Sequence, residues 1–311
     1  MLLIIKRLKE KFLKEESGNA LVLFALSFIV VLGIAGAVID GGIVYNTKSH
    51  LKKAANAAVL SGAQELTNNN DAVNKVVDDI LKAHSEEGSL KQIDIMPNGE
   101  YKLRVALEKE VPTYFCKLFR INSIKVAAVS TAALAPMSRG TGAVPLGIDD
   151  SIPLEYLKEY TLKVDSGDSV YGNFGILALS GPGAKLYEQD LRYGYDGELK
   201  IGDVIDTQTG NIEGKTRDSI NARISACTEP ESGVNHRDCP RIVLILVYKP
   251  YNVISNQLKQ VKITGFAYFY LKEPMGNQDS SVVGYFLKRA GTGYGDSTTR
   301  DNGAYAIRLT E

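Results

Sequence analysis

The sequence has few cysteines and no excess of charge of either sign. Only three of its 311 residues are cysteines, which is too few for a small secreted fold held together by disulfides. The 36 basic residues are balanced by 36 acidic residues, so the chain lacks the basic character of a nucleic-acid-binding protein. A hydrophobic share of 44% excludes a disordered chain. This length allows two folded domains of about 100–200 residues each.

Recognisable catalytic and cofactor-binding motifs are also missing. The sequence contains no nucleophile elbow, phosphate-binding loop or zinc-protease motif. A Ser-His-Asp site would depend on His236, because His50 and His84 lie in segments with a helical pattern. No serine is marked by the sequence as its partner. We therefore predict no enzymatic activity, no cofactor and no metal site.

Proline is absent between residues 20 and 96, and this part of the chain holds the longest apolar run. Residues 20–39 read ALVLFALSFIVVLGIAGAVI and carry no charge, which is the length that a helix needs to cross a hydrocarbon core of roughly 30 Å. Five basic and three acidic residues precede the run, and basic residues favour retention of that end in the cytoplasm. We expect a cytoplasmic tail at 1–19, a single-pass transmembrane helix at 20–39 and an exported remainder.

A cleaved secretory signal is the competing interpretation of this end. Ala35-Gly36-Ala37 has the small-x-small form of a cleavage site. The apolar run, however, is longer than the roughly 7–15 residues of a typical signal, and the helical pattern continues beyond Ala37.

Small residues recur every fourth position near the end of the apolar run. Gly33, Ala37 and Gly41 fall on one face of the expected helix. Such residues let helix backbones approach closely in lipid. The stripe predicts self-association or packing against a partner helix.

Helical spacing continues past the apolar run and then changes to alternation. We expect the same helix to continue to about residue 66 and a second helix to cover 71–84. Further elements are predicted in this order: strands at 91–96 and 101–108, a short helix at 113–119 and a strand at 123–134. The order predicts an α+β domain over residues 40–139.

Composition changes near residue 140. Residues 137–142 are small and polar, which predicts a flexible linker. Residues 140–311 hold 21 of the 29 glycines and 13 of the 16 tyrosines, which is typical of short strands and tight turns. Predicted strands lie at 160–164, 175–179, 242–248, 261–271, 282–287 and 305–309, and predicted helices at 184–191 and 216–227. We expect a second, mainly β exported domain here.

Cys227 and Cys239 bracket an eleven-residue loop. The interpretation we rank first is a disulfide between them, because an exported domain meets an oxidising environment. Two alternatives remain open: a pair of free thiols, and a metal site in which His236 joins the two cysteines but a fourth ligand is lacking.

Several features of the first 65 residues occur together: Gly18-Asn19-Ala20 at the entry to the apolar run, Ile39-Asp40-Gly41-Gly42 at its exit, Tyr45, and LKKAANAAVLSGA at 51–63. In these features residues 16–65 resemble the amino-terminal domain of the TadE/TadG family of tight-adherence (Flp) pilus assembly. The resemblance extends weakly to about residue 140. A membrane helix that continues onto a small sheet also resembles the plan of type IV pilins, which is an analogy of fold.

The resemblance implies a membrane-anchored structural or assembly component of a Flp (type IVb) pilus or a related secretion system, at a bacterial cell surface. Its implied partners are the lipid bilayer and other pilus-assembly membrane proteins, or a second copy of the chain, and no nucleic acid. Pilin-like members cut by a prepilin peptidase carry glutamate five residues after glycine, whereas Leu23 follows Gly18 at this spacing. This departure favours a permanently anchored factor. The alternatives are a membrane-tethered exported enzyme or ligand-binding domain, and a secreted protein released after Ala37.

Overall fold

The computed structural model describes residues 16–96, 101–163, 174–208, 212–228, 238–254, 257–277 and 281–310. The chain divides into two compact units by its internal contacts. The first unit comprises the described residues up to 55 together with 81–92 and 106–129. The second comprises 56–80, 93–105 and the chain from residue 130 onward.

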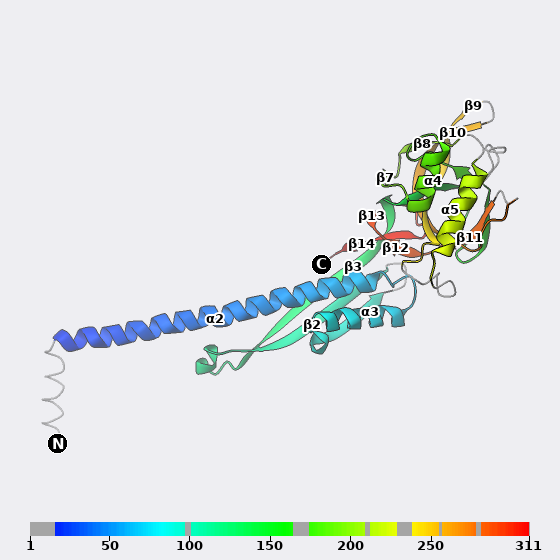
Figure 1. Ribbon diagram of the computed structural model, residues 1–311. Coiled ribbons are helices and arrows are strands. Elements are labelled where there is room, and N and C mark those ends of the chain that lie inside the picture. Colours follow the sequence, from blue (N-terminus) through cyan, green and yellow to red (C-terminus); the bar gives the residue numbers. More distant parts are fainter. Residues whose placement is uncertain are drawn as a thin grey trace, which may run out of the picture. The chain divides into compact units, whose positions relative to one another are not determined.

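One helix, α2 (Glu16–Ala63), contains the apolar run and continues beyond it (Figure 1). Apolar side chains of the run are exposed, whereas Leu51, Ala54 and Ala55 are fully buried. Alanine has the highest helix propensity and its short side chain allows close packing, so the helix crosses this change of surroundings without a break. The predicted single helix from the apolar run to about residue 66 is confirmed, as is the helix at 71–84, which is α3 (Asn70–Ala83).

The elements after α3 follow the predicted order. β1 (Leu90–Met96), β2 (Lys102–Pro112) and β3 (Ser123–Gly140) are neighbours in one sheet, whose order is β1-β2-β3-β14-β12. The three predicted strands are confirmed, and β2 and β3 are longer than expected. The predicted short helix is reduced to a 3-10 turn, η2 (Cys116–Phe119). Residues 97–100, between β1 and β2, lie outside the described residues.

The predicted flexible linker at 137–142 is wrong, because residues 137–140 are the end of β3. Arg139 pairs on one side with β7 (Leu199–Lys200) and on the other with β13 (Gly293–Gly295). Ladder hydrogen bonds therefore order a segment whose small polar composition resembles a linker.

The final strand of the chain returns to the same sheet. β14 (Ala304–Leu309) pairs antiparallel with residues 132–136 of β3, and β12 (Arg289–Gly291) pairs parallel with β14. The domain ranges 40–139 and 140–311 remain a prediction, and this pairing joins residues on the two sides of that boundary.

A second sheet within the second unit has the order β5-β11-β10-β9-β4-β6, with β8 beside β10. Its strands are β4 (Ala143–Asp149), β5 (Glu159–Lys163), β6 (Phe174–Ile176), β8 (Val204–Asp206), β9 (Ile242–Ile254), β10 (Gln257–Leu271) and β11 (Ser281–Leu287). Five of the six predicted strands are confirmed in this sheet, although the one predicted at 175–179 is limited to β6, and the sixth is confirmed as β14 of the first sheet. The mainly β character of this region is confirmed with them. β4 was not predicted. It contains Pro145, which lies in the irregular part of its pairing with β9.

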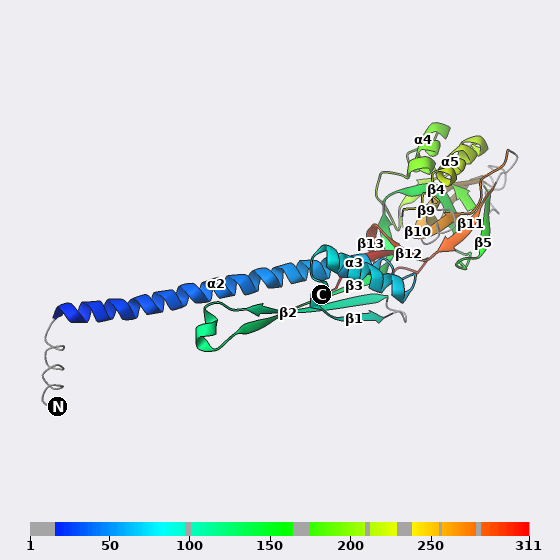
Figure 2. The same ribbon diagram turned by 60° about the horizontal axis from the view of Figure 1, so that its bottom comes forward.

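Residues 243–248 of β9 are buried on both faces, which explains the unbroken apolar sequence of this half of the strand. Val243, Ile245 and Val247 belong to one hydrophobic core. Leu244, Leu246 and Tyr248 belong to a second core on the opposite face, as the two-residue period of a strand requires. The first core also receives side chains of α4 (Ala184–Tyr193) and α5 (Glu213–Ser225), the two predicted helices, which lie side by side over this face in Figure 2.

Phe286 tests the first core. Its ring is fully buried and contacts Tyr160 and Phe269 edge to face, with centroids 4.8 Å and 5.1 Å away. We expect Phe286→Ala to lower the free energy of unfolding by about 3–5 kcal/mol, because it leaves a cavity. The measurement is denaturant unfolding of the detergent-solubilised protein, followed by circular dichroism.

The matched control is Tyr251→Ala, since Tyr251 is 60% exposed. Its expected effect is within about 0.5 kcal/mol of zero. Equal effects of the two substitutions would contradict the assignment of Phe286 to a tightly packed core.

Candidate functional site: the helix at the end of the apolar run

The segment Ala20–Ala63 of α2 has the length and composition of a helix that crosses a membrane. Within the described ranges it is the one helix that meets both conditions. Large apolar side chains are exposed all along the run, and Leu21, Phe24 and Val38 are each about 70% exposed. Side chains of this kind, exposed around a whole helix, are suited to hydrocarbon rather than water.

The predicted small-residue stripe lies on an open part of this helix. No atom of another element comes within 4 Å of a Cβ placed on Gly33 or Gly41, and Ala37 is exposed. The described part of the chain therefore leaves the stripe accessible to another helix. Its role in helix packing stays a prediction.

Gly36, by contrast, is covered by the segment that joins β2 to β3. A Cβ added there would lie 2.5–2.6 Å from side-chain carbons of Phe115. Only glycine fits this contact without displacing the aromatic ring. The apolar run thus has one covered position next to an open stripe.

Asp40, one turn further along α2, holds the same segment through its backbone. Its carboxylate is 3% exposed and accepts hydrogen bonds from the backbone N–H groups of Tyr114, Phe115 and Cys116, at 2.9, 2.9 and 2.6 Å. These donors lie at the start of η2, where N–H groups have no partner within a helical turn. Hydrogen bonds to a charged acceptor are about twice as strong as neutral ones. Asp40 therefore fixes η2 to the end of the apolar run.

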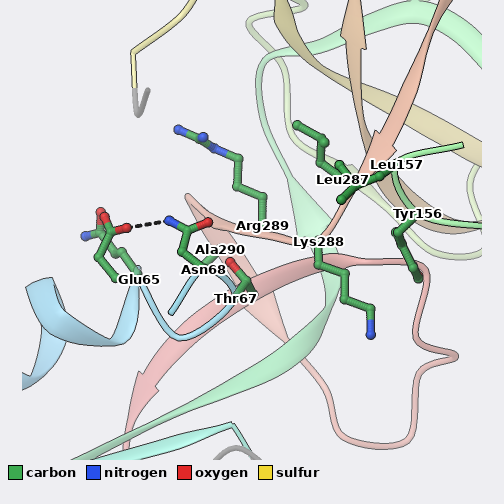
Figure 3. Close-up of a pocket in the computed structure, with 10 residues that line it drawn as sticks. Glu65, Thr67, Asn68, Tyr156, Leu157, Leu287, Lys288, Arg289 and Ala290 are labelled. Carbon is green, nitrogen blue, oxygen red and sulfur yellow. Dashed lines mark hydrogen bonds between the residues drawn. The ribbon is translucent and has the colours of Figure 1, made fainter. Parts of the chain in front are cut away.

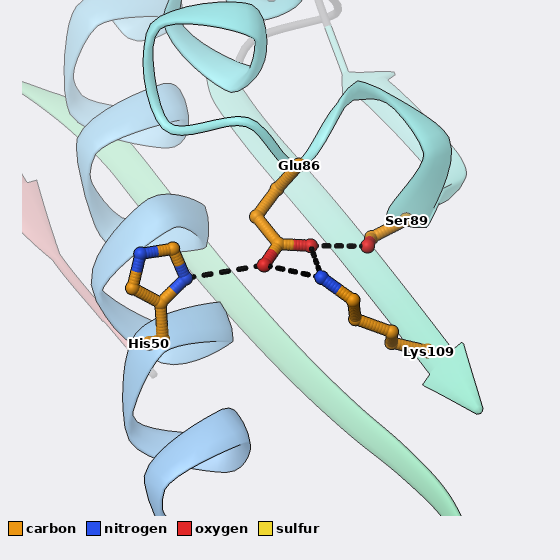
Figure 4. Close-up of polar contacts among 4 residues, drawn as sticks. All are labelled: His50, Glu86, Ser89 and Lys109. Carbon is orange, nitrogen blue, oxygen red and sulfur yellow. Dashed lines mark hydrogen bonds and ion pairs between the residues drawn. The ribbon is translucent and has the colours of Figure 1, made fainter. Parts of the chain in front are cut away.

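A second polar contact lies further along the first unit (Figure 4). Glu86 is 4% exposed and accepts two hydrogen bonds from Lys109 Nζ, at 2.8 and 2.9 Å. Ser89 Oγ also donates to it, and His50 Nδ1 of α2 lies 3.1 Å from Glu86 Oε1. Burial works to raise the pKa of Glu86, but the hydrogen bonds from Lys109 and Ser89 and the charge of Lys109 outweigh it. The pKa of Glu86 therefore lies below its ordinary value.

Sequence reasoning singled out Asp40 only as part of a motif and missed both polar contacts. Asp40 and its donors are more than seventy residues apart, and His50 is separated from Glu86 by 36 residues. No local spacing signals such pairs. Asp40 also follows the apolar run directly, so the sequence alone indicates only that the run ends there.

The structure brings the two predicted disulfide partners together. Cys227 Sγ and Cys239 Sγ lie 2.6 Å apart, at the edge of a small cluster with Tyr270 and Leu287. His236, the third member of the alternative metal site, lies outside the described residues. No group of three metal-ligating side chains is found among the residues that are described.

A cavity of about 280 Å³ in the second unit is lined by both polar and apolar residues (Figure 3). The two cations on its wall, Lys288 and Arg289, extend in opposite directions. Lys288 Nζ lies 4.9 Å from the centre of the Tyr156 ring. Glu65 accepts a hydrogen bond from Asn68 on the far wall. The labelled polar groups do not converge on one point, as a catalytic or ligand site requires.

Glu86 generates a pH prediction. A carboxylate whose pKa is lowered by folding stabilises the folded state above its ordinary pKa of 4.5, and this contribution is lost as the pH falls through the lowered pKa. At neutral pH we expect Glu86→Gln to cost about 1 kcal/mol, because Lys109 is half exposed and solvent screens the pair. The difference in thermal midpoint between the two proteins should shrink at about pH 3.

Glu87→Gln is the matched control, because Glu87 is an exposed neighbour on the same turn. We expect it to leave the thermal midpoint unchanged. A deficit of Glu86→Gln that is as large in acid as at neutral pH would show that the carboxylate charge is not the stabilising element.

The comparisons with known proteins bear on the same helix. Residues 18–65 match a family described as putative Flp pilus-assembly, TadE/G-like. No curated protein and no solved structure matches the chain. The matched range contains the apolar run, Gly36, Asp40 and the buried alanine face of α2. The predicted resemblance is confirmed for this range: residues 18–65 are similar to the TadE/G-like family.

Proposed function

We propose that the protein is a membrane-anchored structural or assembly component of a tight-adherence (Flp, type IVb) pilus or a related secretion system. The observation that carries the proposal is α2. One continuous helix contains nearly all of the family-matched segment, an exposed apolar run long enough to span a bilayer, and a buried face that packs within the folded part of the chain. Such a helix joins a folded region to the membrane without a hinge.

The orientation belongs to this proposal. Five basic residues before the apolar run favour a cytoplasmic tail at 1–19, a span at 20–39 and export of the rest. The chain then acts outside the cell membrane, where a pilus is assembled. Leu23, at the place of the glutamate found in processed pilins, supports a subunit that stays anchored in the membrane.

A structural role is preferred to catalysis. The matched family is described as a putative Flp pilus-assembly family, and the labelled polar groups that line the cavity of Figure 3 point away from one another. The tethered enzyme remains the second candidate, but no observation on the described residues favours it. Lipid and other pilus-assembly membrane proteins, or a second copy of the chain, are the proposed partners.

Gly33 and Ala37 provide the test. Leucine at both positions fills the open stripe without changing the apolar character of the helix. We expect Gly33→Leu/Ala37→Leu to remain in the membrane fraction but to copurify several-fold less with partner subunits or with a differently tagged copy. The measurement is tandem affinity purification from detergent extracts of the native host.

The matched control is Ala35→Leu, a small-to-large change on the opposite face of the same helix. It should copurify as the unchanged protein does. If the unchanged protein runs as a monomer and brings no pilus component with it, the assembly role is wrong. A mature amino terminus at Val38 would instead show that the apolar run is a cleaved signal.

The oxidation state of Cys227 and Cys239 tests whether the domain that contains them is exported. An exported domain meets an oxidising environment, and the two sulfur atoms are already adjacent. We expect a Cys227–Cys239 disulfide in the protein as isolated, detected as a linked peptide by mass spectrometry without reduction. Its loss in Cys227→Ser/Cys239→Ser should cost about 2–4 kcal/mol of stability.

Cys116→Ser is the control, because it removes a thiol outside this pair. It should leave the linked peptide intact. Full alkylation of both Cys227 and Cys239 in unreduced, denatured protein would contradict the disulfide and weaken the exported orientation.

A further inference from the structure

The segment that joins β2 to β3, residues 113–122, ends in a cluster of exposed apolar side chains. We call it the β2–β3 tip. Leu118 is 80% exposed, Phe119 72%, Tyr114 66% and Ile121 48%. Scattered exposed apolar residues are normal, but a cluster at one loop marks a surface that contacts a partner or a membrane.

The position of the tip along α2 identifies the partner. Phe115 packs on Gly36, and Asp40 binds the backbone at 114–116. Gly36 lies within the apolar run, three residues before its end at Ile39, which is about 4.5 Å along a helix axis. An element held against this turn lies at the level where the proposed span leaves the hydrocarbon.

The basic residues of the tip are also suited to the interface between hydrocarbon and water. Lys117 and Arg120 are exposed and flank Leu118 and Phe119 in the sequence. Basic side chains extend from an apolar surface toward the phosphate groups of lipid headgroups. An apolar cluster with basic neighbours is the pattern of segments that lie in a membrane interface.

We propose that the β2–β3 tip inserts into the interface of the same bilayer that α2 spans, with Leu118 and Phe119 among the acyl chains and Lys117 and Arg120 at the headgroups. The inference rests on the proposed span and adds a second membrane contact to it. The tip covers α2 at Gly36, so another helix in the membrane can approach α2 only at its uncovered positions, which include Gly33, Ala37 and Gly41.

Tryptophan offers a direct probe, because the chain contains none. Three single-tryptophan proteins are compared: Phe119→Trp in the tip, Phe28→Trp in the apolar run, and Tyr251→Trp at an exposed position of β9. Each full-length protein is reconstituted into vesicles of phosphatidylcholine and phosphatidylglycerol whose acyl chains carry bromine at a shallow or a deep position.

We expect Phe119→Trp to show blue-shifted emission that is quenched severalfold more by shallow than by deep bromine. Phe28→Trp should be quenched by deep bromine, and Tyr251→Trp by neither. Leu118→Trp repeats the measurement at the adjacent exposed position, so the result does not depend on one substitution. Lys117→Glu/Arg120→Glu should reduce the shallow quenching of Phe119→Trp.

The outcomes separate the two claims. If Phe28→Trp is quenched while Phe119→Trp and Leu118→Trp emit as water-exposed residues, the membrane contact of the tip is overturned and the span stands. If Phe28→Trp, Phe119→Trp and Leu118→Trp all escape quenching, the proposed membrane span itself is wrong. If the tip is unquenched by lipid but shifts its emission when a pilus-assembly protein is added, its partner is a protein and the inference is again overturned.

Discussion

The structure depends on one constraint, which is that a single helix serves two surroundings. Along α2 the side chains change from large, exposed and apolar to small and buried, and the backbone hydrogen bonding continues through the change. A helix is suited to this because all its interior backbone groups are satisfied within the segment. The folded part then needs only to cover the alanine face. Asp40, at the change itself, is charged but keeps its carboxylate occupied by three backbone donors.

Elements with a strong local signal could be predicted from the sequence. The uninterrupted apolar run and the alanine-rich turns predicted α2, and the amphipathic pattern of residues 71–84 predicted α3. In the second half, β9 and β10 were evident from long runs of branched and aromatic residues. These elements are determined by burial along their own length, because a strand covered on both faces needs apolar residues at every position.

The misses are elements and contacts that depend on distant partners. β7 and β13 are two and three residues long and exist only because each pairs with β3. Residues 137–140 have linker-like composition, and pairing on both sides makes them strand. The donors to Asp40 and the partners of Glu86 are likewise set by the fold rather than by spacing. Sequence period reports burial of a segment, but it does not report which segment lies beside it.

Contacts between distant residues also distinguish a simple membrane tether from a component of an assembly. A tether requires only an apolar run, which composition reveals, and any flexible chain can follow it. Here the run contains Gly36, which leaves room for the Phe115 ring. It is followed by Asp40, whose carboxylate accepts hydrogen bonds from the backbone at the start of η2. The hydrogen bonds to Asp40 are directional, and both contacts join residues more than seventy positions apart in the sequence. A helix used only as an anchor does not need them, because lipid holds an apolar helix whatever folded part follows it. They favour a chain in which the orientation of α2 relative to the β2–β3 segment matters, as packing against a partner in a defined register requires.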